Sequence, residues 1–318
     1  MKVVIPGGSG QVGRLLTRHF VARGHDVTIL GRESVAHDAR VRFVQWDGRT
    51  LGPWMDALEG ADVVINLAGK NVNCRYTKKN VAEMMSSRVD STRVLGEAIE
   101  RVEQPPRIWL QMSTATIYAH RLGPPHDEAT GEIGGEEPGV PDYWKRSVDI
   151  ARAWERAQQD AVTPNTRKIQ LRASMVMSHD PGGIFSVLRR LALSGFGGQV
   201  ASGEQMVSWI DAEDFVAAIG FLIERSDLSG PINVAAPHPL PQREFMRELR
   251  RALGAPVGLP ATRWMAEIGA FFLRTDTELL LKSRVVVPAR LLDAGFRFRL
   301  PTWPEAVHAL VERRASTR

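Results

Sequence analysis

The feature that most constrains this chain is a glycine-rich turn between an apolar segment and an amphipathic one. Residues 1–6 form a short apolar run with β-branched side chains, which predicts a buried strand. The segment after the turn carries apolar residues at the spacing of one helix face: Val12, Leu15, Leu16 and Phe20. Three evenly spaced glycines lie between strand and helix: Gly7, Gly10 and Gly13. A main chain without Cβ atoms can turn sharply there and approach a ligand closely.

This strand–turn–helix context predicts a dinucleotide-binding site. The amide groups that open a helix lie at the positive end of its dipole, so they can hold a diphosphate. The context makes the pattern more specific than glycine spacing alone. We assign cofactor contacts to six residues of the turn and the helix opening: Gly7, Ser9, Gly10, Gln11, Val12 and Gly13. The alternative is a tight glycine turn that binds no ligand.

The glycine spacing and several later motifs resemble one protein family. G-x-x-G-x-x-G resembles the short-chain dehydrogenase/reductase superfamily, in particular its extended, epimerase-like branch. Further segments resemble an atypical group within it: 66–69, 75–77, 87–88, 154–155, 171–172, 182–183, 208–210 and 295–296. This is the NAD(P)-dependent, nucleoside-diphosphate-sugar epimerase-like family whose members end in a domain of unknown function of the DUF1731 type. The likeness covers nearly the whole chain.

The resemblance implies an α/β fold with two parts. It implies a Rossmann-type, doubly wound parallel sheet that binds NADP, formed by residues 1–176 and about 206–236. Residues from about 177–205 and 237–318 would form a small α+β C-terminal domain that faces the substrate. A chain of 318 residues is long enough to bury a core of this size.

Composition and charge exclude several other classes of protein. No segment reaches the roughly 18 uncharged apolar residues of a membrane span, and no apolar signal opens the chain, so we expect a cytoplasmic protein without membrane contact. Cys74 is the only cysteine and the eight histidines are scattered, so we predict neither a disulfide framework nor a metal site. The net charge of +5 suits anionic small molecules. Acidic residues interrupt the basic segment 243–251, so we expect no nucleic acid; a homodimer is compatible with the sequence.

The residues after the second and third predicted strands bear on the choice of cofactor. Arg32 follows the strand 26–30, where an arginine suits the 2′-phosphate of NADP and an acid suits the ribose hydroxyl of NAD. We therefore predict NADP(H) over NAD(H). The alternative is that Arg32 is merely exposed and Glu33 meets the ribose. Asp47 follows the strand 41–46 and would contact the adenine amino group as in relatives, or would serve as a turn acid.

The remaining predicted cofactor residues follow later strands. Residues 61–69 predict a strand that ends in a loop of small residues, where the cofactor can approach the main chain. In relatives, the residues at 174–176 contact the nicotinamide end through their backbone. These segments and two residues of the family motifs complete the predicted set: Leu67, Ala68, Gly69, Arg88, Ser113, Ser174, Met175 and Val176.

The catalytic residues of the superfamily are only partly matched. Its members move a hydride between nicotinamide and an oxygen-bearing carbon, and a tyrosine with a lysine four residues later usually transfers the proton. None of the three tyrosines here has that lysine, because Asn80, Leu122 and Ser147 occupy the positions. Aligning Trp154 with the family instead puts Ser147 and Ala151 in the two positions.

Three residues remain as candidates for catalysis: Thr114, Tyr118 and Tyr143. Thr114 matches the Ser or Thr that bonds the reacting oxygen in relatives, or its hydroxyl is satisfied by local backbone. Tyr118 lies in the same segment, and Tyr143 opens the helix 142–160.

Two functions are compatible with this pattern. The first is an NADP-dependent oxidoreductase or epimerase-like enzyme with an unknown carbonyl or sugar-like substrate. The second is a non-catalytic NADP(H)-binding protein that reports redox state to a partner, which the absent tyrosine–lysine pair favours. A ligand switches such a protein only through different affinities for its two states.

Overall fold

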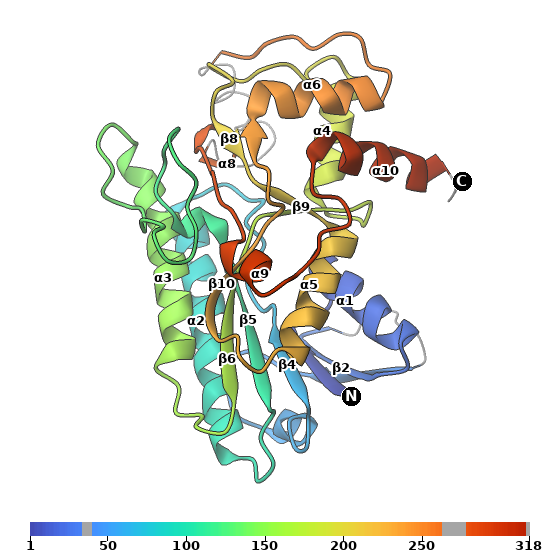
Figure 1. Ribbon diagram of the computed structural model, residues 1–318. Helices are drawn as coiled ribbons and strands as arrows, with labels where there is room; N and C mark the ends of the chain where they lie inside the picture. The colour runs from blue at the N-terminus through green and yellow to red at the C-terminus, as the bar shows by residue number, and fades with distance from the viewer. Residues whose placement is uncertain (34–39, 263–277, 316–318) are drawn as a thin grey trace.

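The core of the molecule is a parallel sheet of seven strands. The computed structural model describes residues 1–33, 40–262 and 278–315 (Figure 1). The strand order is β10-β6-β5-β4-β1-β2-β3, and neighbouring strands pair in parallel. The strands are β1 (Lys2–Pro6), β2 (Asp26–Gly31), β3 (Val41–Gln45), β4 (Val63–Asn66), β5 (Ile108–Thr114), β6 (Arg167–Ala173) and β10 (Gly230–Val234). Their carboxyl ends therefore meet at one edge, where ligands bind in sheets of this type.

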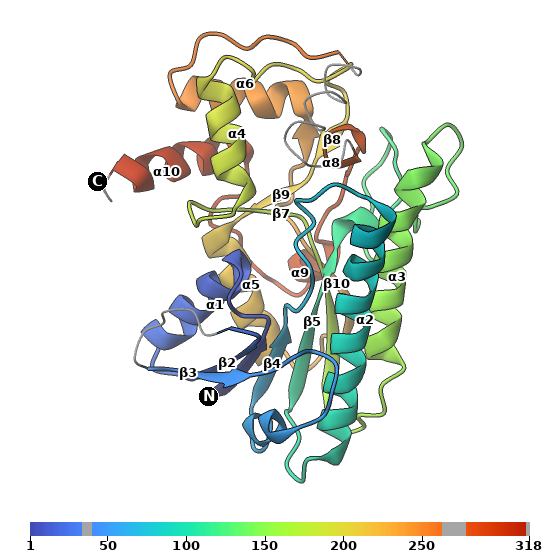
Figure 2. The same cartoon turned by 180° about the vertical axis from the view of Figure 1, so that it is seen from behind.

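Helices cover both faces of this sheet. On one face lie α1 (Gln11–Ala22) and α5 (Ala212–Glu224), and on the other lie α2 (Lys78–Arg101) and α3 (Lys145–Gln159) (Figures 1 and 2). Alternate residues of each strand point to opposite faces. Val3 and Ile5 accordingly pack in one cluster with Phe20 of α1, while Val4 packs in another with Leu95 of α2. Burial on both faces explains why the strands are continuously apolar.

A smaller unit lies beyond the carboxyl edge of the sheet (Figure 2). Its helices are α4 (Ile184–Leu193), α6 (Gln242–Ala252), α8 (Glu278–Leu281) and α10 (Trp303–Ala315), while α9 (Ala289–Asp293) packs against β10 of the sheet. Its short strands pair as β7 (Met175–Met177) with β9 (Trp209–Asp211) and β8 (Met206–Val207) with β11 (Leu240–Pro241). The described residues also form three 3₁₀ turns: η1 (Pro53–Ala57), η2 (Ala115–Ile117) and η3 (Asp142–Trp144).

The structure confirms the α/β fold with a parallel sheet and flanking helices. The clusters also show how the two parts share side chains. Trp209 packs in the cluster of the smaller unit, although we assigned 206–236 to the sheet domain, and Leu291 packs in the sheet core from the C-terminal segment. The predicted helix 142–160 begins as the 3₁₀ turn η3 and continues as α3. The sequence also predicts a helical segment at residues 261–275, which lies almost entirely outside the described residues.

Candidate functional site

Of the three evenly spaced glycines in the turn after β1, the fold requires Gly7 and Gly13 but does not require Gly10. Gly7 has φ +74°, and a Cβ there would lie 2.7 Å from the Ala68 main chain. A Cβ on Gly13 would overlap the Gly8 carbonyl. A Cβ on Gly10 would meet only the Gly7 oxygen, at 3.9 Å. The space beside Gly10, at the start of α1, is thus open for a ligand.

The electrostatics at this point suit an anion. Gly10 is the N-cap of α1, its extended backbone makes no side-chain cap, and no acid lies in the first turn. The amides and the positive end of the helix dipole therefore remain uncompensated by any carboxylate of that turn. This arrangement fits the diphosphate of a dinucleotide. Ser9 and Val12 are partly buried, and the side chain of Val12 packs against the sheet core.

Gln11 joins the glycine turn to the strand β7. Its side-chain amide donates to Ser178 Oγ at 2.8 Å and to the Val176 carbonyl oxygen at 3.4 Å. The structure therefore brings Val176, predicted for the nicotinamide end, next to the predicted diphosphate site. Ser174 lies just before β7, and both its amide and its hydroxyl donate to the Val234 carbonyl oxygen.

Two predicted residues lie at the adenosine end, beyond β2 and β3. Arg32 follows β2 directly and is exposed. Asp47 follows β3, and its carboxylate accepts the Arg49 and Thr50 amides at 2.8 and 3.0 Å and the Thr50 hydroxyl at 2.7 Å. These bonds lower the pKa of Asp47, the Thr50 amide most. The structure thus gives Asp47 the role of a turn acid, and its contact with adenine stays a prediction.

The loop after β4 is positioned by buried polar groups. Asn66 donates to Gln111 Oε1 at 3.0 Å, and its oxygen accepts the Ala68 amide at 3.1 Å. This anchors Leu67 and Ala68 against Gly7, as the close approach of the two main chains requires. The loop and the glycine turn therefore border the same opening.

Arg88 of α2 supports this loop from behind. Its guanidinium donates to the Lys70 carbonyl at 3.0 Å and the Met84 carbonyl at 3.1 Å, and it lies over the Trp154 ring at 4.9 Å. A Cβ on Gly69 would touch it at 3.1 Å. Burial lowers the pKa of Arg88 to about 10. These contacts favour a positioning role over the direct cofactor contact that we predicted.

Ser113 and Tyr118 belong to a buried network centred on Arg172. Arg172 pairs with Glu155 through two bonds of 2.8 and 2.9 Å and donates to the Tyr118 hydroxyl at 3.0 Å. Ser113 donates to Glu155 at 2.6 Å, and Tyr118 donates to Asn233 at 2.8 Å.

This network bears on two sequence-based interpretations. The hydroxyl of Ser113 donates its proton to Glu155 in the interior, and its contact with a cofactor stays a prediction. Tyr118 is 2% exposed and its ring stacks on His126 at 5.0 Å. Burial, more than any neighbour, raises the pKa of Tyr118. A tyrosine bonded on both sides and shielded from solvent is a structural residue, which argues against proton transfer by Tyr118.

Thr114 lies at the carboxyl end of β5, half-buried, as the resemblance implies. Its oxygen accepts the Thr116 amide at 3.1 Å, which is the local bond that we gave as the alternative, and its O–H can still donate. Tyr143 lies in η3, one turn before Ser147 of α3, and is partly buried.

A cluster of charged residues from the C-terminal segment, which was not predicted from the sequence, contacts Ser147 and Thr116. Glu278 accepts the Ser147 hydroxyl at 2.5 Å, Lys282 donates to the Thr116 carbonyl at 2.9 Å, and Arg284 donates to the Thr116 hydroxyl at 3.1 Å. A signal existed in the sequence, since Glu278 and Lys282 flank three leucines at the i, i+4 spacing of a helical ion pair.

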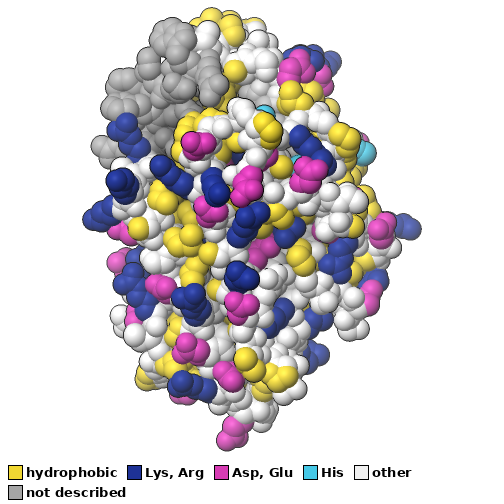
Figure 3. All heavy atoms as spheres, turned by 90° about the vertical axis from the view of Figure 1, so that its left-hand side faces the viewer, with side chains coloured by type: hydrophobic (Ala, Val, Ile, Leu, Met, Phe, Trp, Pro, Cys, Tyr) yellow, Lys and Arg dark blue, Asp and Glu magenta, His cyan; other side chains and the backbone are white. Residues whose placement is uncertain are grey.

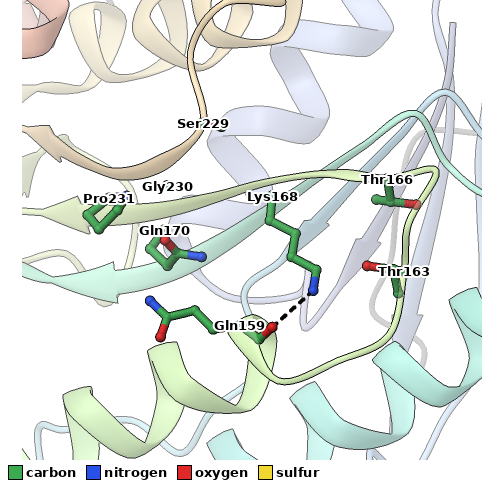
Figure 4. A pocket seen from close by; sticks show the side chains of 8 residues that line it. All are labelled: Gln159, Thr163, Thr166, Lys168, Gln170, Ser229, Gly230 and Pro231. Atoms are coloured by element: carbon green, nitrogen blue, oxygen red, sulfur yellow. Dashed lines mark hydrogen bonds between the residues drawn. The ribbon is translucent and has the colours of Figure 1, made fainter.

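A hollow lies at the opposite edge of the sheet from this site. It is open to solvent and formed at the amino ends of β6 and β10, with Lys168, Gln170 and Gly230 on its wall (Figure 4). None of the predicted site residues lines it. Within the described part of the chain, no group of His, Cys, Asp and Glu could hold a metal ion. Nor does any described helix have the length and apolarity to cross a membrane.

The surface that Figure 3 shows carries charges of both signs. Lysine and arginine side chains alternate there with aspartate and glutamate, and no broad patch of one sign appears. The net positive charge is therefore not gathered into a stripe on this face.

Comparisons with known proteins agree with the geometry. Residues 3–235 match the NAD dependent epimerase/dehydratase family, and residues 261–310 match a domain of unknown function, DUF1731. Epimerase family protein SDR39U1 of Bos taurus is 31% identical over 98% of this chain and 100% of its own length. Epimerase family protein YfhF of Bacillus subtilis is 28% identical over 94% of each chain.

Solved structures show the same likeness. The crystal structure of human SDR39U1 with NADPH has a TM-score of 0.84 and 26% identity, covering 98% of this chain and 99% of that one. A Thermus thermophilus UDP-glucose 4-epimerase complex with NAD, 17% identical with a TM-score of 0.71, shares the fold. The sheet, the glycine turn at its carboxyl edge and these matches together show that the chain belongs to the NAD-dependent epimerase/dehydratase family and ends in a DUF1731 domain.

Proposed function

We propose that the protein is an NADP-dependent oxidoreductase or epimerase-like enzyme that acts on a small carbonyl or sugar-like compound. The observation that carries the proposal is the open space beside Gly10 at the start of α1, bordered by the loop after β4. The NADPH bound to the human relative supports the choice of cofactor. We expect no nucleic-acid partner.

Different residues would bind different parts of the cofactor and the substrate. Amides of the turn at Gly10 and Gln11 would hold the diphosphate, and Arg32 would pair with the 2′-phosphate through charge-assisted bonds. Ala68 and Gly69 would lie against the cofactor through their main chain, and Met175 and Val176 would lie towards the nicotinamide. Thr114 would donate to the oxygen of the substrate. When bound, NADP(H) would supply or accept a hydride.

Calorimetry on Arg32→Ala tests the cofactor preference. We expect the Kd for NADPH to rise about 10–100-fold, because a charge-assisted bond contributes about 1.5–3 kcal/mol. The Kd for NADH should stay within about twofold, since NADH has no 2′-phosphate. Glu33→Ala is the matched control and should leave NADPH binding unchanged. A wild-type protein that prefers NADH, or a loss of NADH binding in Glu33→Ala, would contradict the preference.

Activity is tested by following NADPH absorbance with a panel of carbonyl compounds and nucleoside-diphosphate sugars. The second candidate is a non-catalytic NADP(H)-binding protein that reports redox state. The absent Tyr-x-x-x-Lys pair and the burial of Tyr118 favour it. A partner protein whose affinity differs between the NADP⁺-bound and NADPH-bound chain, with no turnover of any compound, would support this second function.

A further inference from the structure

A buried ion pair from the C-terminal segment reaches the sheet domain. Glu278 opens α8, and Lys282 follows one helical turn later. Their charged atoms are 3.6 Å apart, and each side chain is 1% exposed. Both side chains are thus withdrawn from solvent, although glutamate and lysine are among the residues least often buried.

Each member of the pair bonds to a different element of the candidate site. The Ser147 hydroxyl on α3 donates to Glu278 Oε2 at 2.5 Å, and Lys282 donates to the Thr116 carbonyl at 2.9 Å. The Thr116 amide in turn donates to Thr114 Oγ1 at 3.1 Å. The ion pair therefore connects Ser147 with the backbone that positions Thr114.

Ser147 differs from Glu278 and Lys282 in its exposure to solvent. It is partly exposed, whereas Glu278 and Lys282 behind it are buried. The family resemblance aligns Ser147 with the absent tyrosine and Ala151 with the absent lysine, and Ala151 is 1% exposed and carries no charge. The Glu278 carboxylate thus connects the Ser147 hydroxyl with the buried Lys282 ammonium group, which comes from another part of the chain.

Stability alone does not account for the pair. Burying two charges carries a desolvation penalty that their attraction often does not recover, so apolar residues would serve packing as well. Burial lowers the pKa of Lys282, while Glu278 opposes this shift. Among the described residues, Arg284, Glu137 and His120 are further charged or titratable groups that act on this position.

We propose that Ser147, Glu278 and Lys282 form a proton relay that takes the place of the tyrosine–lysine pair. The proposal rests on the proposed function. In the oxidative direction, the substrate hydroxyl gives its proton to Ser147 Oγ as the Ser147 proton passes to the Glu278 carboxylate. The substrate carbon is oxidised to a carbonyl by loss of a hydride to the nicotinamide, which is reduced. The Lys282 ammonium stabilises Glu278 in its ionised state. Reduction runs the same proton steps in reverse.

In this scheme Ser147 is the catalytic residue, and the ion pair acts through it. We expect Ser147→Ala to lower kcat about 100-fold or more, the scale of general acid–base catalysis, with the Kd for NADPH unchanged. Ser147→Thr keeps the hydroxyl and should recover at least a tenth of the wild-type rate. Lys282→Met should lower kcat and move the acid limb of the pH–rate profile up by about one pH unit, because the carboxylate loses its cation.

Lys168→Met is the matched control. Lys168 is also a lysine whose pKa burial lowers, and it also donates to main-chain carbonyls, among them Gln159 at 3.2 Å (Figure 4). It lies at the amino end of β6, the opposite edge of the sheet. Its replacement should leave kcat, the pH profile and the Kd for NADPH as in the wild type.

A second measurement needs no substrate. With ¹³C-labelled lysine, the Lys282 signal is assigned by its loss in Lys282→Met and titrated by NMR. We expect its titration to move to lower pH in Glu278→Gln, and to differ between the NADP⁺ and NADPH complexes, because only the oxidised nicotinamide ring is cationic. The Lys168 signal should respond to neither change.

The outcomes separate the two proposals. If NADPH binds and the Lys282 signal does not distinguish NADP⁺ from NADPH, the relay is wrong and the proposed cofactor stands. Full activity in Ser147→Ala would overturn the relay in the same way. If neither nucleotide binds the wild-type protein, the proposed function itself is wrong, and the relay with it. A folded Lys282→Met variant with wild-type kcat and pH profile would show that the pair only anchors the C-terminal segment.

Discussion

Arg172 is the side chain on which the buried polar contacts of the sheet domain converge. Its bonds to Glu155 and Tyr118 connect β6 with α3 and with the segment after β5. Burial alone would lower the pKa of Arg172, but the Glu155 carboxylate more than compensates and raises it. The guanidinium therefore stays charged in the interior, and removing Glu155 would leave that charge unpaired.

His19 provides a test of pH dependence. Burial, helped by Arg23 and His25, lowers the pKa of His19 to about 4. The unfolded chain, with a histidine pKa near 6.5, then binds more protons between these values, so the fold is stable above pH 6.5 and loses stability as pH falls towards 4. The full shift corresponds to about 3 kcal/mol, which solvent screening of this partly exposed ring reduces to about 1–2 kcal/mol.

We therefore expect His19→Gln to lose less stability than the wild type between pH 7.5 and 4.5. Urea unfolding at both pH values measures the difference, and the other titrating groups contribute equally to both proteins. An identical loss of free energy of unfolding in the two proteins would show that His19 is not shielded as the structure indicates.

In the turn between β1 and α1, the fold requires some of the glycines, while another leaves space for a ligand. Gly7 and Gly13 allow the main chain to approach the Ala68 loop and the Gly8 carbonyl, whereas nothing in the folded chain requires a glycine at position 10. The backbone of Gly10 has φ −74°, which any residue can adopt.

Two substitutions in this turn should distinguish an effect on ligand binding from an effect on stability. Gly10→Ala should lower stability by about 1 kcal/mol or less, the cost of alanine at an N-cap, but weaken NADPH binding at least tenfold because the added Cβ occupies the ligand space. Gly13→Ala should lower the free energy of unfolding by about 1–3 kcal/mol or more, because the added Cβ would overlap the Gly8 carbonyl. Thermal unfolding without cofactor and calorimetry with NADPH measure the two effects. Wild-type affinity in Gly10→Ala would remove the diphosphate from this position.

For the molecule as a whole, the C-terminal segment joins the two parts. Leu291 and Phe296 pack in the sheet core, while Trp303 packs in the smaller unit. Trp303 is 1% exposed, stacks on Phe245 at 4.0 Å and donates to the Phe245 carbonyl at 2.9 Å. One segment thus contributes to both cores and supplies the ion pair at the candidate site.

Trp303→Ala should therefore lower the free energy of unfolding by about 3–5 kcal/mol, the range for truncating a large buried aromatic side chain. Phe196→Ala, at a phenylalanine that is 64% exposed in the same unit, is the control and should change it by less than about 0.5 kcal/mol. Chemical unfolding followed by circular dichroism measures both. Equal effects would mean that α10 does not pack on α6.

The local elements that open the chain could be read from local patterns. The strand, glycine turn and helix at residues 1–20 are recognisable because backbone freedom and apolar periodicity act over a few residues. The absence of the usual tyrosine–lysine pair is also visible in the sequence, because the two residues would be only four positions apart. Other features could not be read in this way: the sequence does not show the bond from Tyr118 to Asn233, or the bonds that the Asp47 carboxylate accepts from the Arg49 and Thr50 amides.

The sequence by itself determined the glycine turn and the lack of Tyr-x-x-x-Lys, because each depends on residues close together along the chain, while the parallel α/β architecture followed from the family resemblance. Only the tertiary structure decided that Arg172 closes off Tyr118 from 54 residues away, and that Ser147 meets Glu278 across 131 residues. Such contacts have no spacing signature. They depend on how the sheet and the C-terminal segment pack, and burial then sets which side chains keep a charge or a free hydroxyl.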